Sequence, residues 1–470
     1  MVMSINLNEI KKIHFIGIGG IGLSAIAKLM VWQGKKVSGS DCQASEITDE
    51  LKELGVKIFI GHNKKNLDKD VGLAAYTLAV GQDNPEIQKA KKLNIPILTY
   101  PEFLGLLIKD KFGIAISGTH GKSTVTSMVA LILEKAGLDP TVVVGGKISE
   151  FGGNVRISKS KYFIFEACEY QRAFLNYWPK VIVLNNIELD HTDYYKDIKD
   201  YESAFEEFIG HLPKDGVLIV NEKNQKSKIK NQNYNSKCKI LSFGIDKKND
   251  LVAYDIKFEN GKTKFNVNFK NKNLGEFSLQ IPGIFNVYNA LAAISVGLLL
   301  GIDIEIIKKT LAEFKGIWRR FEHIGNCQGA EIYSDYAHHP TEVRSTIDGA
   351  RKFFPGKRII AVFQPHQHNR TKNLFQNFIN SFDNADLIIL NEIFDVAGRE
   401  NINDQNISSL DLVNEIKKHS KNKTVLFGKN LKETEKLILE NIKKNDVVLI
   451  MGAGDIYKLN SKFKTQKPKL

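Results

Sequence analysis

The segment from residue 112 to 137, FGIAISGTHGKSTVTSMVALILEKAG, constrains the fold more than any other part of the sequence. It starts as a short apolar run typical of a buried strand, turns through GTHGKST, and continues as an apolar-faced helix that Gly137 can end. Glycines let several backbone N–H groups face one anion, and the helix N-terminus adds partial positive charge. Lys122 supplies a cation, and Ser123 or Thr124 supplies a hydroxyl for Mg²⁺. The segment predicts a phosphate-binding loop between a strand and a helix.

This loop departs from the usual phosphate-loop spacing. The first glycine of that pattern would fall at Ile116, and the nearest one here is Gly118. We therefore interpret the segment as a shorter variant of the loop. The alternative is a Gly/Ser/Thr-rich turn that binds no ligand.

Length and composition favour a cytoplasmic protein of about three domains. The 470 residues are 43% hydrophobic and 25% charged, and the four cysteines have no paired spacing. The first residues, MVMSINLNEIKK, lack the apolar core of a signal peptide, and the longest apolar run is too short to span a bilayer. A net charge of +13 is compatible with nucleic acid or an anionic surface, but no base-stacking aromatics are interleaved with the lysines. We expect no nucleic-acid partner and no membrane insertion.

The first predicted domain, residues 1–109, begins with a strand, a glycine turn, a helix and a second strand. Gly17, Gly19 and Gly22 form G-x-G-x-x-G, and Asp41 closes the second strand about 20 residues later. Further strands are predicted at 58–60, 72–80 and 95–98, which indicates a small doubly wound sheet. Taken alone, the motif suggests NAD. The underlying physics requires only a pyrophosphate at a helix N-terminus, so any nucleoside diphosphate would satisfy it.

The second predicted domain, residues 110–322, carries acidic residues and a histidine at strand ends. Strands at 161–166 and 180–184 are followed by Glu166, Glu169 and His191. Ligands of open α/β sheets collect at the carboxyl ends of strands, and Mg²⁺ prefers oxygen ligands. We expect these side chains to converge on a Mg²⁺–triphosphate, with His191 alternatively orienting a neighbour or a phosphate.

The rest of this domain changes its pattern. Residues 238–281 alternate with period two, and Asn260-Gly261 is a hairpin signal, which predicts an antiparallel insertion or an edge of the same sheet. A buried helix is predicted from about Asn286 to Gly301, with Asn286 either its N-cap or a ligand. A second helix, 304–314, leads to a boundary segment that contains Arg319 and Arg320.

The third predicted domain, residues 323–470, is another alternating α/β unit. Strands are predicted at 331–335, 358–363, 387–390, 424–426 and 447–450. Polar clusters follow three of them, DYAHHP, QPHQHNR and GAGD. Such clusters at strand ends favour a binding site.

Eight blocks in a fixed order resemble the Mur ligases of peptidoglycan synthesis. They are HFIGIGGIGLSAIA…GSD, SGTHGKSTVTSM, EACE…NNIELDHTDYY, IPGIFNVYNALAAI, RRFE, SDYAHHPTEV, FQPHQHNRT and MGAGDIY. The resemblance covers essentially the whole chain. Within the family it is strongest to the members that act on UDP-N-acetylmuramate and L-alanine.

The resemblance implies an α/β fold of three domains. These are an N-terminal Rossmann-like domain for the UDP-sugar, a central P-loop ATPase-type domain with an antiparallel portion, and a C-terminal Rossmann-like domain for the amino acid. It also implies an ATP- and Mg²⁺-dependent ligase that joins L-alanine to the carboxylate of UDP-N-acetylmuramate through an acyl phosphate. A monomer or homodimer is expected.

The resemblance further implies roles for individual residues. Lys122, His191 and Arg320 would be catalytic, and Ser123, Glu166 and His191 would hold the metal. The residues implied for ATP are Gly118, Thr119, His120, Gly121, Lys122, Ser123, Thr124, Asn289 and Asp335. The residues implied for the UDP-sugar are Gly17, Gly19, Gly20, Gly22, Ser40 and Asp41, and those for the amino acid are His338, His366 and Arg370.

Several alternatives stay open. Many relatives have histidine, an acid and arginine where this sequence has Phe285, Cys168 and Gln367. Arg319 and Arg320 could be interdomain salt-bridge residues. The enzyme could instead be a recycling ligase that adds a murein tripeptide, or the chain could be an NAD-binding dehydrogenase or sensor.

Overall fold

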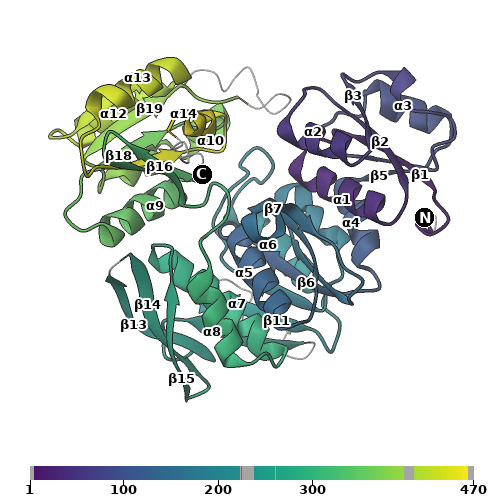
Figure 1. Ribbon diagram of the computed structural model, residues 1–470, viewed down its shortest axis with the longest axis horizontal. Helices are drawn as coiled ribbons and strands as arrows, with labels where there is room; N and C mark the ends of the chain where they lie inside the picture. Colours follow the sequence, from purple (N-terminus) through teal and green to yellow (C-terminus); the bar gives the residue numbers. More distant parts are fainter. Residues whose placement is uncertain (1–4, 223, 225–237, 260, 396–406, 464–470) are drawn as a thin grey trace, which may run out of the picture.

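The chain forms three lobes, each built around one β-sheet (Figure 1). The structure, a computed structural model, describes residues 5–222, 224, 238–259, 261–395 and 407–463. In Figure 1 the N-terminal lobe lies at upper right, the central lobe below, and the C-terminal lobe at upper left. The expected α/β fold of three domains is confirmed. No helix among the described residues has the length and apolar character needed to cross a bilayer.

The N-terminal sheet is parallel throughout, in the order β3-β2-β1-β4-β5. Its strands are β1 (Lys12–Ile16), β2 (Lys36–Asp41), β3 (Lys57–Ile60), β4 (Leu73–Tyr76) and β5 (Ile97–Thr99). Its helices are α1 (Ile21–Trp32), α2 (Glu46–Glu53), α3 (Pro85–Lys92) and α4 (Tyr100–Ile108). The glycine turn after β1 therefore opens onto the N-terminus of α1, as a doubly wound sheet requires.

The central sheet has ten strands, parallel in the middle and antiparallel at both edges, in the order β15-β14-β13-β12-β11-β10-β6-β9-β7-β8. The strands are β6 (Phe112–Ser117), β7 (Thr141–Ile148), β8 (Gly153–Arg156), β9 (Tyr162–Glu166), β10 (Val181–Leu184), β11 (Val217–Asn221), β12 (Lys239–Gly244), β13 (Leu251–Glu259), β14 (Lys262–Phe269) and β15 (Lys272–Leu279). The period-two segment is thus an edge of the same sheet. Of its turn residues, Asn260 lies outside the described residues.

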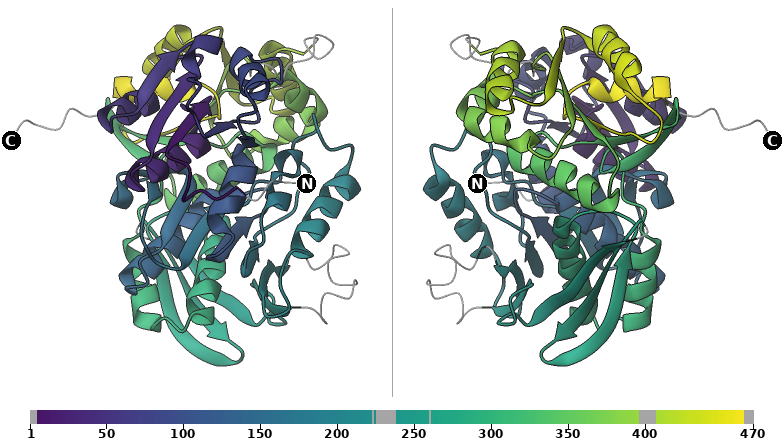
Figure 2. Two further views of the ribbon diagram at one scale, coloured as in Figure 1. Left: turned by 90° about the vertical axis from the view of Figure 1, so that its right-hand side faces the viewer. Right: turned by 90° about the vertical axis from the view of Figure 1, so that its left-hand side faces the viewer.

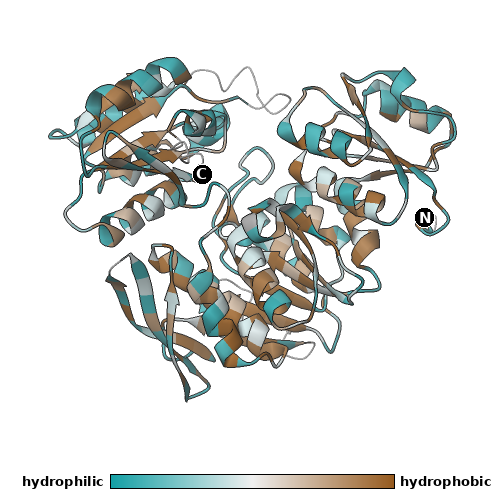
Figure 3. Ribbon diagram, viewed as in Figure 1, coloured by the Kyte–Doolittle hydropathy of each residue, from teal (hydrophilic) through white to brown (hydrophobic). Residues whose placement is uncertain are grey.

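The two faces of this sheet are covered by different helices, α5 (Lys122–Lys135), α7 (Ile284–Leu299) and α8 (Ile304–Glu313) on one and α6 (Ile198–Ile209) on the other. Along β6, Ile114 and Ile116 join the cluster of α5 and α7, while Ala115 joins that of α6. Because side chains alternate along a strand, a strand covered on both faces is apolar throughout. Figure 3 shows the resulting hydrophobic strands in the interior of the lobe.

Helix α7 begins earlier than the sequence suggested. Its N-cap is Gly283, with φ +95°, so Asn286 lies within the first turn and is not the cap. The Asn286 side chain donates to the carbonyl of Pro282 at 2.7 Å. Gly301, with φ +70°, follows the helix as expected.

The C-terminal sheet has the order β16-β17-β21-β18-β19-β20, with only the β16–β17 pair antiparallel. Its strands are β16 (Glu322–Cys327), β17 (Ala330–Asp335), β18 (Ile359–Phe363), β19 (Leu387–Asn391), β20 (Thr424–Gly428) and β21 (Val447–Met451). The helices are α9 (Pro340–Phe353), α10 (His368–Asn373), α11 (Phe375–Ile379), α12 (Ser409–His419), α13 (Leu431–Asn441) and α14 (Asn460–Phe463). Figure 2 shows this lobe and the N-terminal lobe above the central one.

The segment between α8 and β16 turns sharply. Gly316, Arg319 and Phe321 all have positive φ. Three such residues in six positions reverse the chain and deliver the C-terminal lobe back onto the carboxyl ends of the central strands. The exact domain boundaries, 109/110 and 322/323, stay a prediction.

Candidate active site

The loop between β6 and α5 has the conformation that a phosphate-binding loop needs. Gly118 and Gly121 have φ of +128° and +81°. A Cβ at Gly121 would lie 2.4 Å from Asn289 Oδ1 and 2.5 Å from Asn185 Nδ2, so a larger residue would collide. The loop is held by Asn186, which accepts from the backbone N–H groups of Thr119 at 2.9 Å and of His120 at 2.7 Å. The first N–H groups of a helix have no partner within that helix, so those of α5 are suited to binding an anion.

Lys122 lies at the first position of α5 and is held by an acid. Its Nζ is 3.1 Å from Glu169 Oε1 and donates to the carbonyls of Gly118 and Thr119 at 2.6 and 3.0 Å. His191 Nε2 lies 3.5 Å from the same Glu169 oxygen. Burial opposes ionisation of Glu169, but Lys122 and His191 outweigh it and lower its pKa. Three residues predicted for the site, Lys122, Glu169 and His191, therefore lie together.

Ser123 and Glu166 form a second polar pair beside the loop. The hydroxyl of Ser123 hydrogen-bonds Glu166, which also accepts from the N–H of Gly145. Burial raises the pKa of Glu166 despite these bonds and the nearby Lys122 and Arg320. A carboxylate held in this way is stabilised further by a cation. Hydroxyl and carboxylate oxygens are ligands that suit Mg²⁺.

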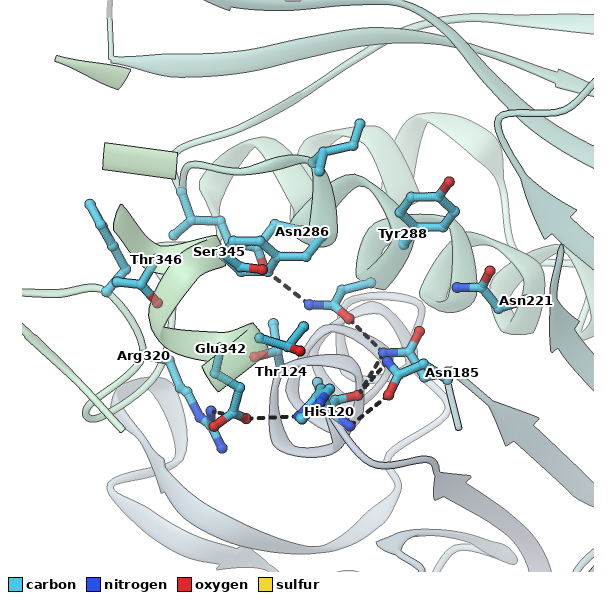
Figure 4. A pocket seen from close by; sticks show the side chains of 18 of the residues that line it. His120, Thr124, Asn185, Asn221, Asn286, Tyr288, Arg320, Glu342, Ser345 and Thr346 are labelled. Atoms are coloured by element: carbon cyan, nitrogen blue, oxygen red, sulfur yellow. Dashed lines mark hydrogen bonds and ion pairs between the residues drawn. The ribbon is translucent and has the colours of Figure 1, made fainter. Parts of the chain in front are cut away.

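A cavity of about 340 Å³ opens beside the loop, between the central and C-terminal lobes (Figure 4). Its size is that of a small-molecule pocket. Asn185 donates to the carbonyl of His120 and to Asn289 at 2.9 Å each, and Asn289 donates to Asn286 at 3.0 Å. The lining includes His120, Asn185, Phe285, Asn286, Tyr288, Asn289, Arg320, Asp335, Thr341 and Glu342.

Asp335 and the two neighbouring arginines, Arg319 and Arg320, make different contacts. Asp335 lines the cavity and accepts from the N–H groups of Phe321 and Ala337, both at 2.8 Å. Arg320 points into the cavity, with its Nη1 3.6 Å from Glu342. Arg319 is buried between the rings of Tyr336 and Tyr457 and donates to carbonyls of the C-terminal lobe. Of the two arginines, Arg320 is the one that faces the site.

His120 joins the phosphate loop to the C-terminal lobe. Its Nε2 is 3.0 Å from Glu188 and its Nδ1 is 3.2 Å from Glu342, the latter on α9. Although burial opposes protonation, the two carboxylates raise the pKa of His120 to about 9. Its ring lies 5.0 Å from that of His339, whose pKa is lowered to about 4 by burial and by His120.

The residues predicted for the amino acid lie together. Arg370 Nη1 is 3.1 Å from His366 Nδ1, and the rings of His338 and His366 are 6.1 Å apart. Arg370 is almost fully buried, and its Nε and Nη2 donate to Asp190 of the central lobe at 3.1 and 2.9 Å. A guanidinium bound in this way keeps Nη1 on the side of His366.

The glycine turn of the N-terminal lobe is packed closely. Gly17 has φ +81°, a Cβ at Gly20 would lie 3.4 Å from a loop carbonyl, and a Cβ at Gly22 would lie 2.8 Å from Tyr100. The N–H of Gly19 donates to Asp41 at 2.8 Å. The next residue back, Ser40, points inward and donates to the buried Glu86 at 2.7 Å.

Comparison with known proteins identifies the family. The profile described as "Mur ligase middle domain" matches residues 116–297, "Mur ligase family, catalytic domain" matches 12–112, and "Mur ligase, glutamate ligase domain" matches 319–454. The chain is 43% identical over 470 residues to the UDP-N-acetylmuramate–L-alanine ligase of Caldanaerobacter subterraneus subsp. tengcongensis, covering 99% of this chain and all of the relative. The chain belongs to the Mur ligase family.

Solved structures of Mur ligases share the fold. The UDP-N-acetylmuramate-alanine ligase of Thermotoga maritima superposes with a TM-score of 0.81 at 30% identity, covering 96% of this chain and 98% of that one. A murein peptide ligase of Psychrobacter arcticus superposes with a TM-score of 0.71 at 24% identity and equal coverage. The second likeness concerns the fold alone.

The three residues that the sequence analysis set apart from the family pattern have different surroundings. Phe285 lines the cavity, and Gln367 is buried with φ +69° at the start of α10. Burial and then the neighbouring Glu169 raise the pKa of the Cys168 thiol to about 12, so this thiol is kept neutral.

Sequence reasoning missed several polar residues of the site. Asn185, Asn186, Glu188 and Asp190 all lie in the NNIELDH block, in which His191 is the one predicted site residue. The signal was present, because four polar side chains at one strand end are expected to face the same edge of the sheet. For Glu342 the sequence indicates only a capping box and no role in the site, because this residue is the third of α9.

Proposed function

We infer that this protein is an ATP-dependent ligase that joins L-alanine to the carboxylate of UDP-N-acetylmuramate. The observation that carries the inference is 43% identity, over practically the whole of both chains, with a ligase named for these two substrates. The phosphate loop, the cavity beside it and the cluster of His338, His366 and Arg370 supply a place for each chemical task.

The central chemistry is the activation of a carboxylate. The lactyl carboxylate would attack the γ-phosphate of ATP, which gives an acyl phosphate and releases ADP. The amine of L-alanine would then attack the acyl carbon, and the amide forms as inorganic phosphate leaves and the amine loses a proton. Because carboxylate and phosphate are both anions, their approach needs cations. Lys122 at the start of α5 and Arg320 in the cavity are the cations placed to meet that charge.

The metal would be Mg²⁺, held by Ser123, Glu166 and His191. The fit rests on the oxygens of Ser123 and Glu166, which are hydrogen-bonded to each other, and on the burial that raises the pKa of Glu166, since a cation would favour its charged form. His191 Nδ1 is buried without a hydrogen-bond partner among the described residues, so this nitrogen is available to a ligand while Nε2 faces Glu169. Mg²⁺ supplies positive charge to the phosphates.

The two other substrates have separate places. The glycine turn at 17–22 with Asp41 would hold the UDP moiety, because its backbone approaches closely enough for a pyrophosphate and it opens onto the N-terminus of α1. Arg370 would bind the L-alanine carboxylate through Nη1, beside His338 and His366. Since it uses ATP and a nucleotide sugar, we place the enzyme in the cytoplasm.

The direct test is phosphate release by the purified protein with UDP-N-acetylmuramate, L-alanine, ATP and Mg²⁺. We expect release that requires both substrates and a product heavier by one alanine residue. Release that is independent of either substrate would refute the proposal. A panel of L-alanine, glycine, L-serine and a murein tripeptide separates the alanine ligase from a recycling ligase, and tight NADH binding that UDP-sugar does not displace would indicate a dehydrogenase.

A further inference from the structure

Glu342 lies where the predicted ATP site and the predicted amino-acid site meet. It is the third residue of α9, is 11% exposed at its side chain, and lines the cavity. Its Oε2 accepts from the N–H groups of His338 at 3.1 Å and His339 at 3.3 Å, which is a capping box. Capping of α9 explains the contacts of only one of the two carboxylate oxygens, Oε2.

The other oxygen reaches into the central lobe. Glu342 Oε1 is 3.2 Å from His120 Nδ1, in the phosphate loop, and 3.6 Å from Arg320 Nη1 (Figure 4). His120 and Glu342 are 222 positions apart in the chain, so this contact exists only when the C-terminal lobe is docked. The Glu342 carboxylate of α9 therefore contacts both His120 in the phosphate loop and Arg320 in the cavity.

Glu342 Oε2 also contacts a side chain of the predicted amino-acid site, which consists of His338, His366 and Arg370. His338 Nδ1 lies 3.1 Å from Glu342 Oε2 and 3.1 Å from the carbonyl of Tyr336. Because both neighbours are acceptors, Nδ1 carries a proton that is directed at Glu342 and at the carbonyl of Tyr336. Glu342 thus helps to orient the ring of His338.

Charge explains why glutamate suits this position. Burial opposes ionisation of Glu342, but His338, His120 and the hydrogen bonds from both rings keep its pKa well below its ordinary value. An ionised carboxylate attracts His120 and Arg320 more strongly than a neutral amide of the same shape would. Glu188 is a weaker candidate for the same task, since its side chain is 41% exposed and it contacts Thr341, which is outside the amino-acid cluster.

We propose that Glu342 is a positioning residue that couples the amino-acid site to the phosphate loop. When L-alanine engages His338, the Glu342 carboxylate is held against His120 and Arg320, and the nucleotide site is completed. By thermodynamic reciprocity, each ligand then tightens the binding of the other. The inference rests on the proposed function, because it takes L-alanine and ATP as the two ligands.

The experiment is a calorimetric titration with a non-hydrolysable ATP analogue, in the presence of Mg²⁺ and saturating UDP-N-acetylmuramate. The coupling ratio is the Kd of the analogue without L-alanine divided by its Kd with saturating L-alanine. We expect a ratio of about fivefold or more for the unmodified enzyme. Glu342→Gln keeps the capping box and removes the charge, so its ratio should fall to about one, well below the usual range of coupling.

The matched control is Glu305→Gln. Glu305 also lies in the first turn of a helix, α8, but is 73% exposed and pairs only with Lys308 among the described residues. Its coupling ratio should equal that of the unmodified enzyme. Glu342→Asp keeps the charge and shortens its reach by one methylene, so an intermediate ratio is expected, and this variant decides the matter if Glu342→Gln does not fold.

A ratio of one in the unmodified enzyme, or an unchanged ratio in Glu342→Gln or Glu342→Asp, would overturn the inference. These outcomes differ from failure of the proposed function, in which the unmodified enzyme releases no phosphate with both substrates present. An enzyme that turns over and shows no coupling through Glu342 refutes the inference alone.

Discussion

Lys122 illustrates how a lysine stays charged in a buried site. Its ammonium group donates to Glu169 and to two loop carbonyls. Burial opposes its charge, but Glu169 and its neighbours raise the pKa of Lys122 above its ordinary value. The side chain is therefore charged, and it lies at the N-terminus of α5, where we propose that the phosphates bind.

Replacing Lys122 by methionine should lower kcat on the order of 100-fold or more, because a cation that faces the developing phosphate charge is lost. Steady-state phosphate release measures this. Lys135→Met, at the exposed end of the same helix, should leave the rate unchanged. Equal rates in Lys122→Met and the unmodified enzyme would contradict the assigned role.

Asp190 is a second buried charged residue, and its main contact is with Arg370. It lies in the central lobe and holds two of the guanidinium nitrogens of Arg370, which leaves Nη1 facing His366. Burial opposes its ionisation, but Arg370 and nearby histidines keep the pKa of Asp190 well below its usual value.

Asp190→Asn should raise the KM for L-alanine about tenfold or more, since Arg370 then loses the buried charge that orients it. The KM for UDP-N-acetylmuramate should change little. Asp193→Asn is the control, because Asp193 is exposed and its carboxylate accepts from Tyr170. A variant in which all KM values rise together would indicate general damage to the site and not loss of positioning.

Helix α5 and its two flanking glycines show what an element adds to its residues. Gly121 precedes the helix and Gly137 follows it, with φ of +81° and +75°. Both positions are costly for any other residue. Of the two, Gly121 is also confined by neighbours, whereas a Cβ at Gly137 would meet no atom of the described residues within 4 Å.

Replacing each of these two glycines by alanine should separate the cost of backbone strain at positive φ from the cost of a steric collision. Gly137→Ala should destabilise the protein by about 1 kcal/mol and leave nucleotide affinity unchanged. Gly121→Ala has the same strain and also forces the loop away from Asn185 and Asn289, so we expect a further loss of stability and the loss of nucleotide binding. Chemical denaturation and nucleotide titration measure the two effects. Normal nucleotide affinity in Gly121→Ala would contradict the close packing of the loop.

At the scale of the whole molecule, the docking of the C-terminal lobe depends on charged contacts with the central lobe. His120 is placed between Glu188 and Glu342, and Arg370 pairs with Asp190. Such contacts lose strength when one partner is neutralised. Docking should therefore depend on pH in the range where His120 titrates.

The pKa of His120 is about 9 in the folded protein and 6.5 ordinarily, so its stabilising contribution is complete below about pH 6.5 and is lost as the pH rises through 9. His120→Gln should lower the Tm at pH 7 and lower it much less at pH 9.5. The control is His419→Gln, which changes a half-exposed side chain of α12. A Tm difference of equal size at both pH values would show that His120 does not contribute through its charge.

Most of the architecture and the central motif follow from local pattern. The run of apolar residues before GTHGKST, the apolar face after it and Gly137 specify β6, the loop and α5, because each depends on residues within a few positions of one another. The three alternating α/β units and the residues of the phosphate loop were predictable for the same reason. The start of α7 was not, since Gly283 caps it through backbone geometry that composition does not reveal.

Partner choice within the site was decided by the docking of distant segments. Nothing near Lys122, Arg370 or Glu342 in the sequence indicates that they pair with Glu169, Asp190 and His120, which are 47, 180 and 222 positions away. Glu169 meets Lys122 because β9 pairs with β6 within the central sheet, whereas the other two pairs form where the C-terminal lobe contacts the central lobe. A sequence pattern records which residues a helix or strand presents, whereas the approach of one lobe to another determines which of those side chains meet.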